Sequence, residues 1–173
     1  MNSKKLFIWG FLFVSVIGTL LHFVYEWSGN NSIVRLFAPW NESTWEHMKL
    51  LFFPMLVLIL FLFFKLPEQS PIPVALSIGT LVGLALIPIL FYTYTGVLGF
   101  SVMAIDIAIF YISVLGAFLI GWFLKDNREL ANRRGLLLTC LVILAILFFI
   151  FSYYPPGIGP VSYTHLTLPT NSL

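Results

Sequence analysis

Five long apolar stretches limit this chain of 173 residues to one broad class of fold. A helix that crosses a membrane needs about 20 mostly apolar residues, and it satisfies its own backbone hydrogen bonds in lipid. We expect such helices over residues 6–25, 44–64, 73–92, 97–124 and 135–153. The sequence therefore predicts an all-α integral membrane bundle of five transmembrane helices, which residues 1–160 form as a single domain.

The composition excludes several other classes of protein. Hydrophobic residues make up 60% of the chain and charged residues only 9%, whereas a soluble domain has about 25% charged residues on average. Nine Lys and Arg residues against seven Asp and Glu residues leave a net charge of +2, too few cations for a phosphate-binding surface. We therefore expect the lipid bilayer as a partner and no nucleic acid. A single cysteine, Cys140, excludes an intramolecular disulfide and a multi-thiolate metal site.

The basic residues predict the orientation of the chain. With the N-terminus inside, seven of them lie on the cytoplasmic side, namely Lys4, Lys5, Lys65, Lys125, Arg128, Arg133 and Arg134. Only Arg35 and Lys49 then lie outside. The positive-inside rule thus predicts an N-inside and C-outside protein of the cytoplasmic (inner) membrane.

The second span brings polar residues to its outer end. Its apolar run, residues 50–64, covers about 22 Å, less than the roughly 30 Å of a bilayer core. The pattern Ser43-x-x-Glu46 is typical of a capping box, with Asn41 as an alternative cap, so we expect the helix to begin near residue 44. Glu46, His47 and Lys49 then lie at the outer interface.

Helical spacing groups some of these side chains and separates others. Glu42, Glu46 and Lys49 are expected on one helix face, whereas His47 lies about 100° away. His22 and Glu26, four residues apart at the end of the first span, also share a face.

The fourth span carries a carboxylate that is expensive to bury. Asp106 lies nine residues past the expected start of the span, so we expect it roughly 13 Å deep. A charged side chain in the membrane costs at least about 2.5–3.5 kcal/mol and usually faces the bundle interior or a cavity. Tyr94 adds a hydroxyl at the outer end of the preceding span.

These residues together predict a polar site near the outer leaflet. The candidate catalytic residues are Glu46, His47 and Asp106, and the candidate binding residues are His22, Glu26, Asn41, Glu42, Lys49 and Tyr94. Histidine and carboxylate ligands suit a divalent metal such as zinc, manganese or iron, with His22, Glu46 and Asp106 as the candidate ligands. The alternative is that these groups only pair with one another.

These residues are consistent with three functions. One is a membrane-embedded hydrolase for a lipid or lipid-linked substrate, in which a metal or Glu46 activates water and Asp106 or His22 acts as general acid or base. A second is a small transporter or ion pathway that uses Asp106, which predicts a homo-oligomer. The third is a non-catalytic membrane assembly partner, with Gly79 and Gly83 as its packing face.

Two stretches of this sequence resemble a known family. His22-Phe-Val-Tyr-Glu-Trp-Ser-Gly and Asn41-Glu-Ser-Thr-Trp-Glu-His-Met-Lys49 are similar to motifs of an uncharacterised family of small bacterial and archaeal membrane proteins, a domain of unknown function. Phe91-Tyr-Thr-Tyr-Thr-Gly96 and Asp106-Ile also match its pattern. The resemblance covers about residues 5–157. It implies five spans and a shared outer site but no activity.

The end of the chain departs from that family. Val161-Ser-Tyr-Thr-His-Leu-Thr-Leu-Pro-Thr-Asn171 resembles a translated sequencing-adapter read-through. We interpret residues 161–173 as a non-native tail and exclude His165 from the candidate ligands.

Overall fold

The computed structural model describes residues 2–157, and long helices dominate that part of the chain. The elements are α1 (Ser3–Trp27), α2 (Val34–Phe37), α3 (Thr44–Lys65), α4 (Ile72–Leu98), α5 (Met103–Leu124), the 3₁₀ helix η1 (Arg128–Arg133) and α6 (Arg134–Tyr153). No strand occurs within the described range. Five helices are long and apolar enough to cross a membrane, which confirms the predicted all-α architecture.

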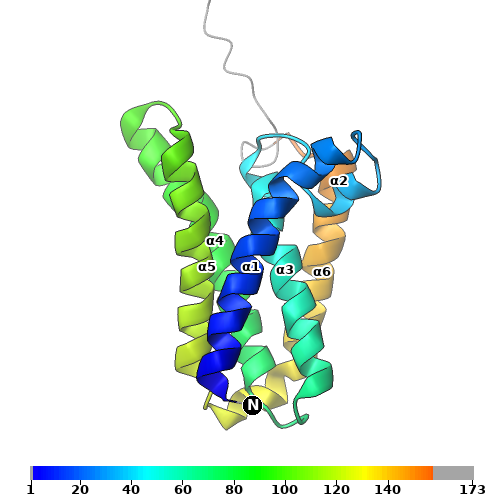
Figure 1. Ribbon diagram of the computed structural model, residues 1–173, viewed down its shortest axis with the longest axis vertical. Coiled ribbons are helices and arrows are strands. Elements are labelled where there is room, and N and C mark those ends of the chain that lie inside the picture. The colour runs from blue at the N-terminus through cyan, green and yellow to red at the C-terminus, as the bar shows by residue number, and fades with distance from the viewer. Residues whose placement is uncertain (1, 158–173) are drawn as a thin grey trace, which may run out of the picture.

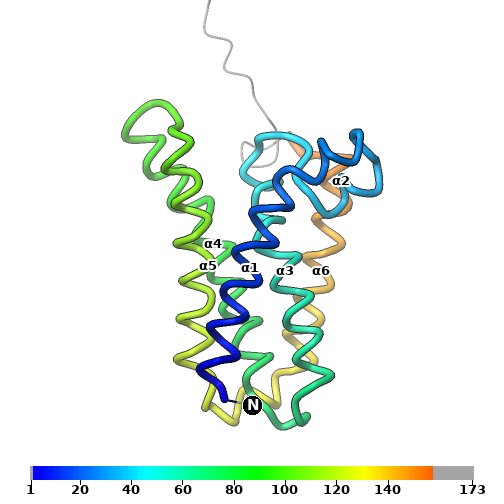
Figure 2. The backbone as a smooth tube through the Cα atoms, viewed as in Figure 1, coloured from blue at the N-terminus to red at the C-terminus, as the bar shows by residue number. Residues whose placement is uncertain are grey.

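The long helices run alongside one another as a single bundle (Figure 1). The N-terminus lies at one end of the bundle and α6 ends at the other, as an odd number of crossings requires. α2 lies at the end where α1 stops, and the connected ends of α4 and α5 lean away from α1, α3 and α6 (Figure 2). The residues expected as a non-native tail, 161–173, lie outside the described part.

α3 forms much of the core, and its N-cap residue, Ser43, sets where the helix begins. Leu51, Phe52 and Met55 are fully buried in this helix. Ser43 is the N-cap, with an extended backbone (φ −71°, ψ 146°), and its side chain accepts a hydrogen bond from the Glu46 N–H. Because the chain is not helical before Thr44, Glu42 does not continue the helix face of Glu46, and that expectation was wrong.

The turn between α4 and α5 lies further along the chain than expected. α4 continues through the Tyr-Thr-Tyr-Thr segment to Leu98, since the Thr95 hydroxyl donates to the carbonyl oxygen of Phe91 one turn earlier. Gly99 then adopts a left-handed conformation (φ 80°) and ends the helix. Asp106 therefore lies in the first turn of α5 instead of deep within a span.

Two glycines let α4 approach the backbone of α5. A Cβ atom on Gly79 would lie 2.1 Å from the carbonyl oxygen of Ala117, and one on Gly83 would lie 2.8 Å from that of Ser113. This small-residue face therefore packs within the chain, as is typical of membrane helices.

We predict that Gly79→Ala destabilises the bundle. The added methyl group overlaps the α5 backbone, and overpacking of this kind costs about 1–3 kcal/mol. Gly96→Ala is the matched control in the same helix, because a Cβ there meets no atom within 4 Å. Thermal unfolding in detergent should give a lower Tm for Gly79→Ala than for Gly96→Ala, and equal Tm values would contradict the close α4–α5 contact.

Candidate functional site

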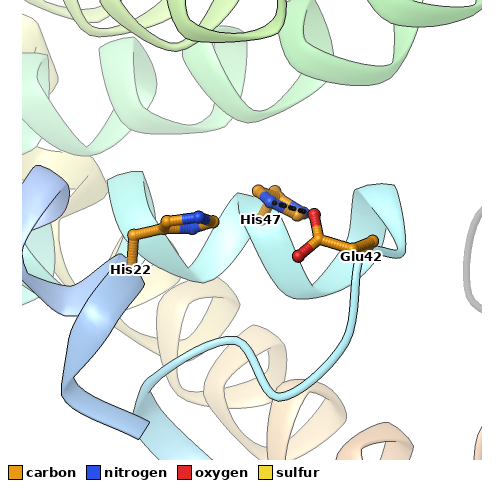
Figure 3. Close-up of side chains that lie close together, drawn as sticks. All are labelled: His22, Glu42 and His47. Atoms are coloured by element: carbon orange, nitrogen blue, oxygen red, sulfur yellow. Dashed lines mark ion pairs between the residues drawn. The ribbon is translucent and has the colours of Figure 1, made fainter. Parts of the chain in front are cut away.

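Two histidines and a glutamate come together at the end of the bundle that α2 covers. His22 comes from the last turns of α1, Glu42 from the segment before α3, and His47 from the first turn of α3. Each offers one ligand atom, and these atoms all lie within 4.8 Å of one another. Figure 3 shows the His47 ring between the side chains of His22 and Glu42. We call these three residues the His–Glu cluster.

Backbone hydrogen bonding sets the tautomer of His47. Its Nδ1 lies 3.0 Å from the carbonyl oxygen of Ser43, and because a carbonyl only accepts, Nδ1 carries the proton. Nε2 then faces the Glu42 carboxylate, with 3.3 Å between Nε2 and Oε2. A carboxylate also only accepts, so a cation at Nε2, either a proton or a metal ion, is needed to stabilise this contact.

The contact with His47 also stabilises the negative charge of Glu42. The hydrogen bond with His47 lowers the pKa of the Glu42 carboxyl below its ordinary value, and nearby histidine charge adds to this effect. The side chain is 69% exposed. Glu42 is therefore an ionised carboxylate at neutral and mildly acidic pH, and it can reach a ligand from solvent.

His22 connects the cluster to a small pocket. Its ring centroid lies 5.4 Å from that of His47, with 39° between the planes. The adjoining pocket has a volume of about 120 Å³ and is lined by His22, Phe23, Tyr25, Glu26, Pro39, Trp40, Asn41 and Glu42. Glu26 and Asn41, two of the predicted binding residues, thus share a pocket with two members of the cluster.

Glu46 and Lys49 form a separate and buried ion pair. Lys49 Nζ lies 2.6 Å from Glu46 Oε2, and the two side chains are 0% and 2% exposed. The ammonium group also donates to Ser152 Oγ at 2.5 Å and to the Arg35 carbonyl oxygen at 3.0 Å. All three N–H groups of Lys49 therefore have an acceptor.

Arg35 extends this network to the segment between α1 and α3. Its Nη2 donates to the Ser152 carbonyl oxygen at 2.5 Å, and its guanidinium lies 3.6 Å from the centroid of the Trp40 ring. The Trp40 N–H in turn donates to Glu46 at 3.4 Å. Ser152 was not among the predicted site residues, because a serine inside an apolar span carries no signal for a partner in another helix.

Asp106 lies in a third group. The Tyr94 hydroxyl donates to the Asp106 carboxylate and accepts from the Val102 N–H at 3.1 Å, which ties together the turn between α4 and α5. A carboxylate in the first turn of a helix is also stabilised by the helix dipole.

The structure therefore places the three predicted metal ligands in three separate groups of side chains. His22 lies in the His–Glu cluster, whereas Glu46 pairs with Lys49 and Asp106 with Tyr94. Glu46 and His47 are neighbours in sequence, so they point about 100° apart and enter different groups. Within the described residues, the convergence of three such ligand atoms occurs at His22, Glu42 and His47.

We predict that Lys49→Met strongly destabilises the protein, because it leaves Glu46 buried without its cation. Breaking one side of a buried pair costs about 3–5 kcal/mol, whereas replacing both sides is often neutral. The double variant Glu46→Gln/Lys49→Met should therefore regain most of the Tm lost in Lys49→Met. Additive losses in a double-mutant cycle would contradict the pairing.

One of three comparisons with known proteins identifies a family for this chain. Searches of curated proteins and of solved structures found no match. A family model described as a family of unknown function, DUF6512, matches residues 1–166. This chain, with five helices suited to cross a membrane, belongs to the DUF6512 family.

Proposed function

We propose that this membrane protein binds a divalent metal ion at the His–Glu cluster and uses it in a hydrolytic reaction. The observation that carries the proposal is the convergence of three ligand atoms within 4.8 Å. Two histidines and one carboxylate with an open position are the ligand set of many catalytic zinc sites and of non-haem iron sites.

The spacing of the ligand atoms in the His–Glu cluster fits a zinc ion. Zinc ligands bond at about 2.0–2.2 Å, so neighbouring ligand atoms of a tetrahedral site lie roughly 3.3 Å apart. Glu42 and His47 already have a separation of 3.3 Å, so the adjustment falls on the His22 side chain. The Ser43 carbonyl oxygen accepts a hydrogen bond from the His47 Nδ1–H group, and a metal-bound histidine usually donates its other ring N–H in this way.

The remaining pocket residues supply acid–base chemistry. A bound divalent ion polarises a substrate oxygen and lowers the pKa of nearby water. Glu26, which lines the adjoining pocket, accepts the proton as the water oxygen bonds to the acyl carbon or phosphorus. Glu26 then returns the proton to the leaving oxygen as the ester bond breaks, so the products are an acid and an alcohol.

The predicted orientation supports a reaction at the outer face of the cytoplasmic membrane. Seven of nine basic residues lie on the side of the N-terminus in the predicted topology, and the His–Glu cluster lies at the opposite end.

Two observations support a hydrolase over the other functions that the sequence left open. Asp106, the residue expected to bind a transported ion, is engaged by Tyr94 in the first turn of α5. Gly79 and Gly83, the expected assembly face, are used between α4 and α5.

We predict stoichiometric metal in protein purified in detergent and its loss in His22→Ala, Glu42→Gln and His47→Ala. Each variant removes one ligand, and elemental analysis measures the bound metal. Glu26→Gln is the matched control, because it changes a pocket carboxylate outside the ligand set. Only trace metal in the unmodified chain would reject the site.

The same control variant separates metal binding from catalysis. Glu26→Gln should keep its metal and lose about 10²–10⁴-fold in the hydrolysis of p-nitrophenyl butyrate, since it lacks the proton acceptor. Unchanged turnover with bound metal would remove Glu26 from the reaction.

We predict that metal affinity falls as the pH drops from about 7.5 to 5.5. Imidazole must lose its proton to bind a metal, and it titrates ordinarily near 6.5. Glu42 stays ionised over this range because its pKa is lowered, so loss of its charge does not cause the change. Isothermal titration at pH 5.5 should show that the protein releases protons as it binds the metal ion. A pH-independent affinity would contradict histidine ligation.

A further inference from the structure

We propose that Arg35 is a positioning residue, which holds the segment before α3 in place so that the Glu42 carboxylate meets His47 in the His–Glu cluster. Arg35 is half-buried and lies in α2, between α1 and α3. The inference rests on the proposed function for the role of Glu42 as a metal ligand. The placing of the segment itself does not require a metal.

Glu42 depends on its backbone for its position. Its side chain is 69% exposed, and among the described residues its carboxylate makes its one polar contact with His47. Figure 3 shows Glu42 where the non-helical segment meets α3. Ordering an exposed side chain costs conformational entropy, so a single contact holds it only when the backbone already places it close to its partner. The path of residues 38–43 therefore decides whether Glu42 reaches His47.

Glu42 lies between two residues that are fixed in different ways. Ser43, the N-cap of α3, is held by the helix itself, because its carbonyl oxygen accepts the His47 N–H at 3.2 Å. Trp40 is held from outside the segment, and its backbone N–H donates to Glu46 at 3.4 Å. A hydrogen bond of that length is weak. Trp40 therefore needs a further contact if it is to fix the path of the chain toward Glu42.

The Arg35 guanidinium supplies that contact and joins Trp40 to α6. It lies 3.6 Å from the centroid of the Trp40 ring and 4.9 Å from that of the Tyr153 ring. Its Nη2 also donates to the Ser152 carbonyl oxygen at 2.5 Å. A planar guanidinium can lie against an aromatic ring and donate hydrogen bonds at the same time, which a lysine ammonium does less well. Arg35 is therefore chemically suited to hold Trp40 against the end of α6.

The backbone around Arg35 is fixed as well. Its carbonyl oxygen accepts a hydrogen bond from the buried Lys49 ammonium at 3.0 Å. The Tyr153 hydroxyl donates to the Ser32 carbonyl oxygen at 2.7 Å, just before α2 in the chain. These two bonds come from α3 and from α6, so α2 is tied to both helices. The Arg35 side chain therefore reaches Trp40 from a backbone that long helices hold.

The first test follows the segment in metal-free protein. Arg35→Met removes the guanidinium but keeps the carbonyl oxygen that Lys49 needs. Arg134→Met is the matched control at the opposite end of the bundle, because Arg134 also lies against an aromatic ring, that of Phe63, and donates to a backbone carbonyl oxygen. Hydrogen exchange of the amides in residues 38–43, measured by mass spectrometry in detergent, should be several-fold faster in Arg35→Met alone. Equal exchange in the two variants would overturn the proposal.

The second test keeps Arg35 and changes the ring that it contacts. The Trp40 indole N–H makes no hydrogen bond in the described part of the chain, so Trp40→Phe keeps an aromatic face and loses no polar contact. Trp40→Leu removes that face. Exchange over residues 38–43 should stay close to that of the unmodified chain in Trp40→Phe and become several-fold faster in Trp40→Leu. The same exchange in both variants would mean that the cation does not hold the segment, and would overturn the role of Arg35.

The third test asks whether this positioning reaches the His–Glu cluster, with Co²⁺ titrated into metal-free protein. Arg35→Met should weaken Co²⁺ binding about 10–100-fold, the usual effect of losing a group that orients a metal ligand. Glu42→Gln leaves the two histidines and a weaker site. Arg35→Met combined with Glu42→Gln should bind no more weakly than Glu42→Gln alone, because a misplaced carboxylate and a missing one are equivalent. Additive losses would mean that Arg35 does not act through Glu42, and would overturn the proposal.

The exchange results and the metal results separate the two proposals. Absence of Co²⁺ binding in the unmodified chain would reject the metal site, while faster exchange of residues 38–43 in Arg35→Met would still support the positioning role. Bound Co²⁺ with unchanged exchange and unchanged affinity in Arg35→Met would support the metal site and overturn the role of Arg35.

Discussion

A lysine without solvent contact, held by Glu46, Ser152 and the Arg35 carbonyl, connects three separate segments of this apolar bundle. An ammonium group in such a place is tolerated only when all its protons are paired, and removing one partner costs several kcal/mol. The pairing therefore holds the segment between α1 and α3 against α3 and α6. That segment carries Glu42, so the contact between Glu42 and His47 depends on a charge pair that is not part of the His–Glu cluster.

Much of the architecture could be predicted, and the exceptions have specific causes. The apolar runs predicted five helices, and the Ser43 cap follows from its sequence pattern. The reciprocal half of the capping box differs, because Asn41 accepts from the Ser43 N–H at 2.9 Å while Glu46 turns inward to Lys49. Nothing near Glu46 in sequence announces Ser152, which is 106 residues away. The end of α4 was misplaced because threonine hydroxyls that bond to the preceding turn let a polar segment stay helical.

The sequence by itself determined the class of fold, the number of long helices and the set of polar residues at one end of them. It could do so because lipid forces each span to satisfy its own backbone, which makes apolar length a local and readable signal. Only the tertiary structure decided how those polar residues are partnered: His22 and His47 with Glu42, Glu46 with Lys49, and Asp106 with Tyr94. The reason is physical, since side-chain partners depend on helix rotation and on the path of the connecting segments, which no local pattern encodes.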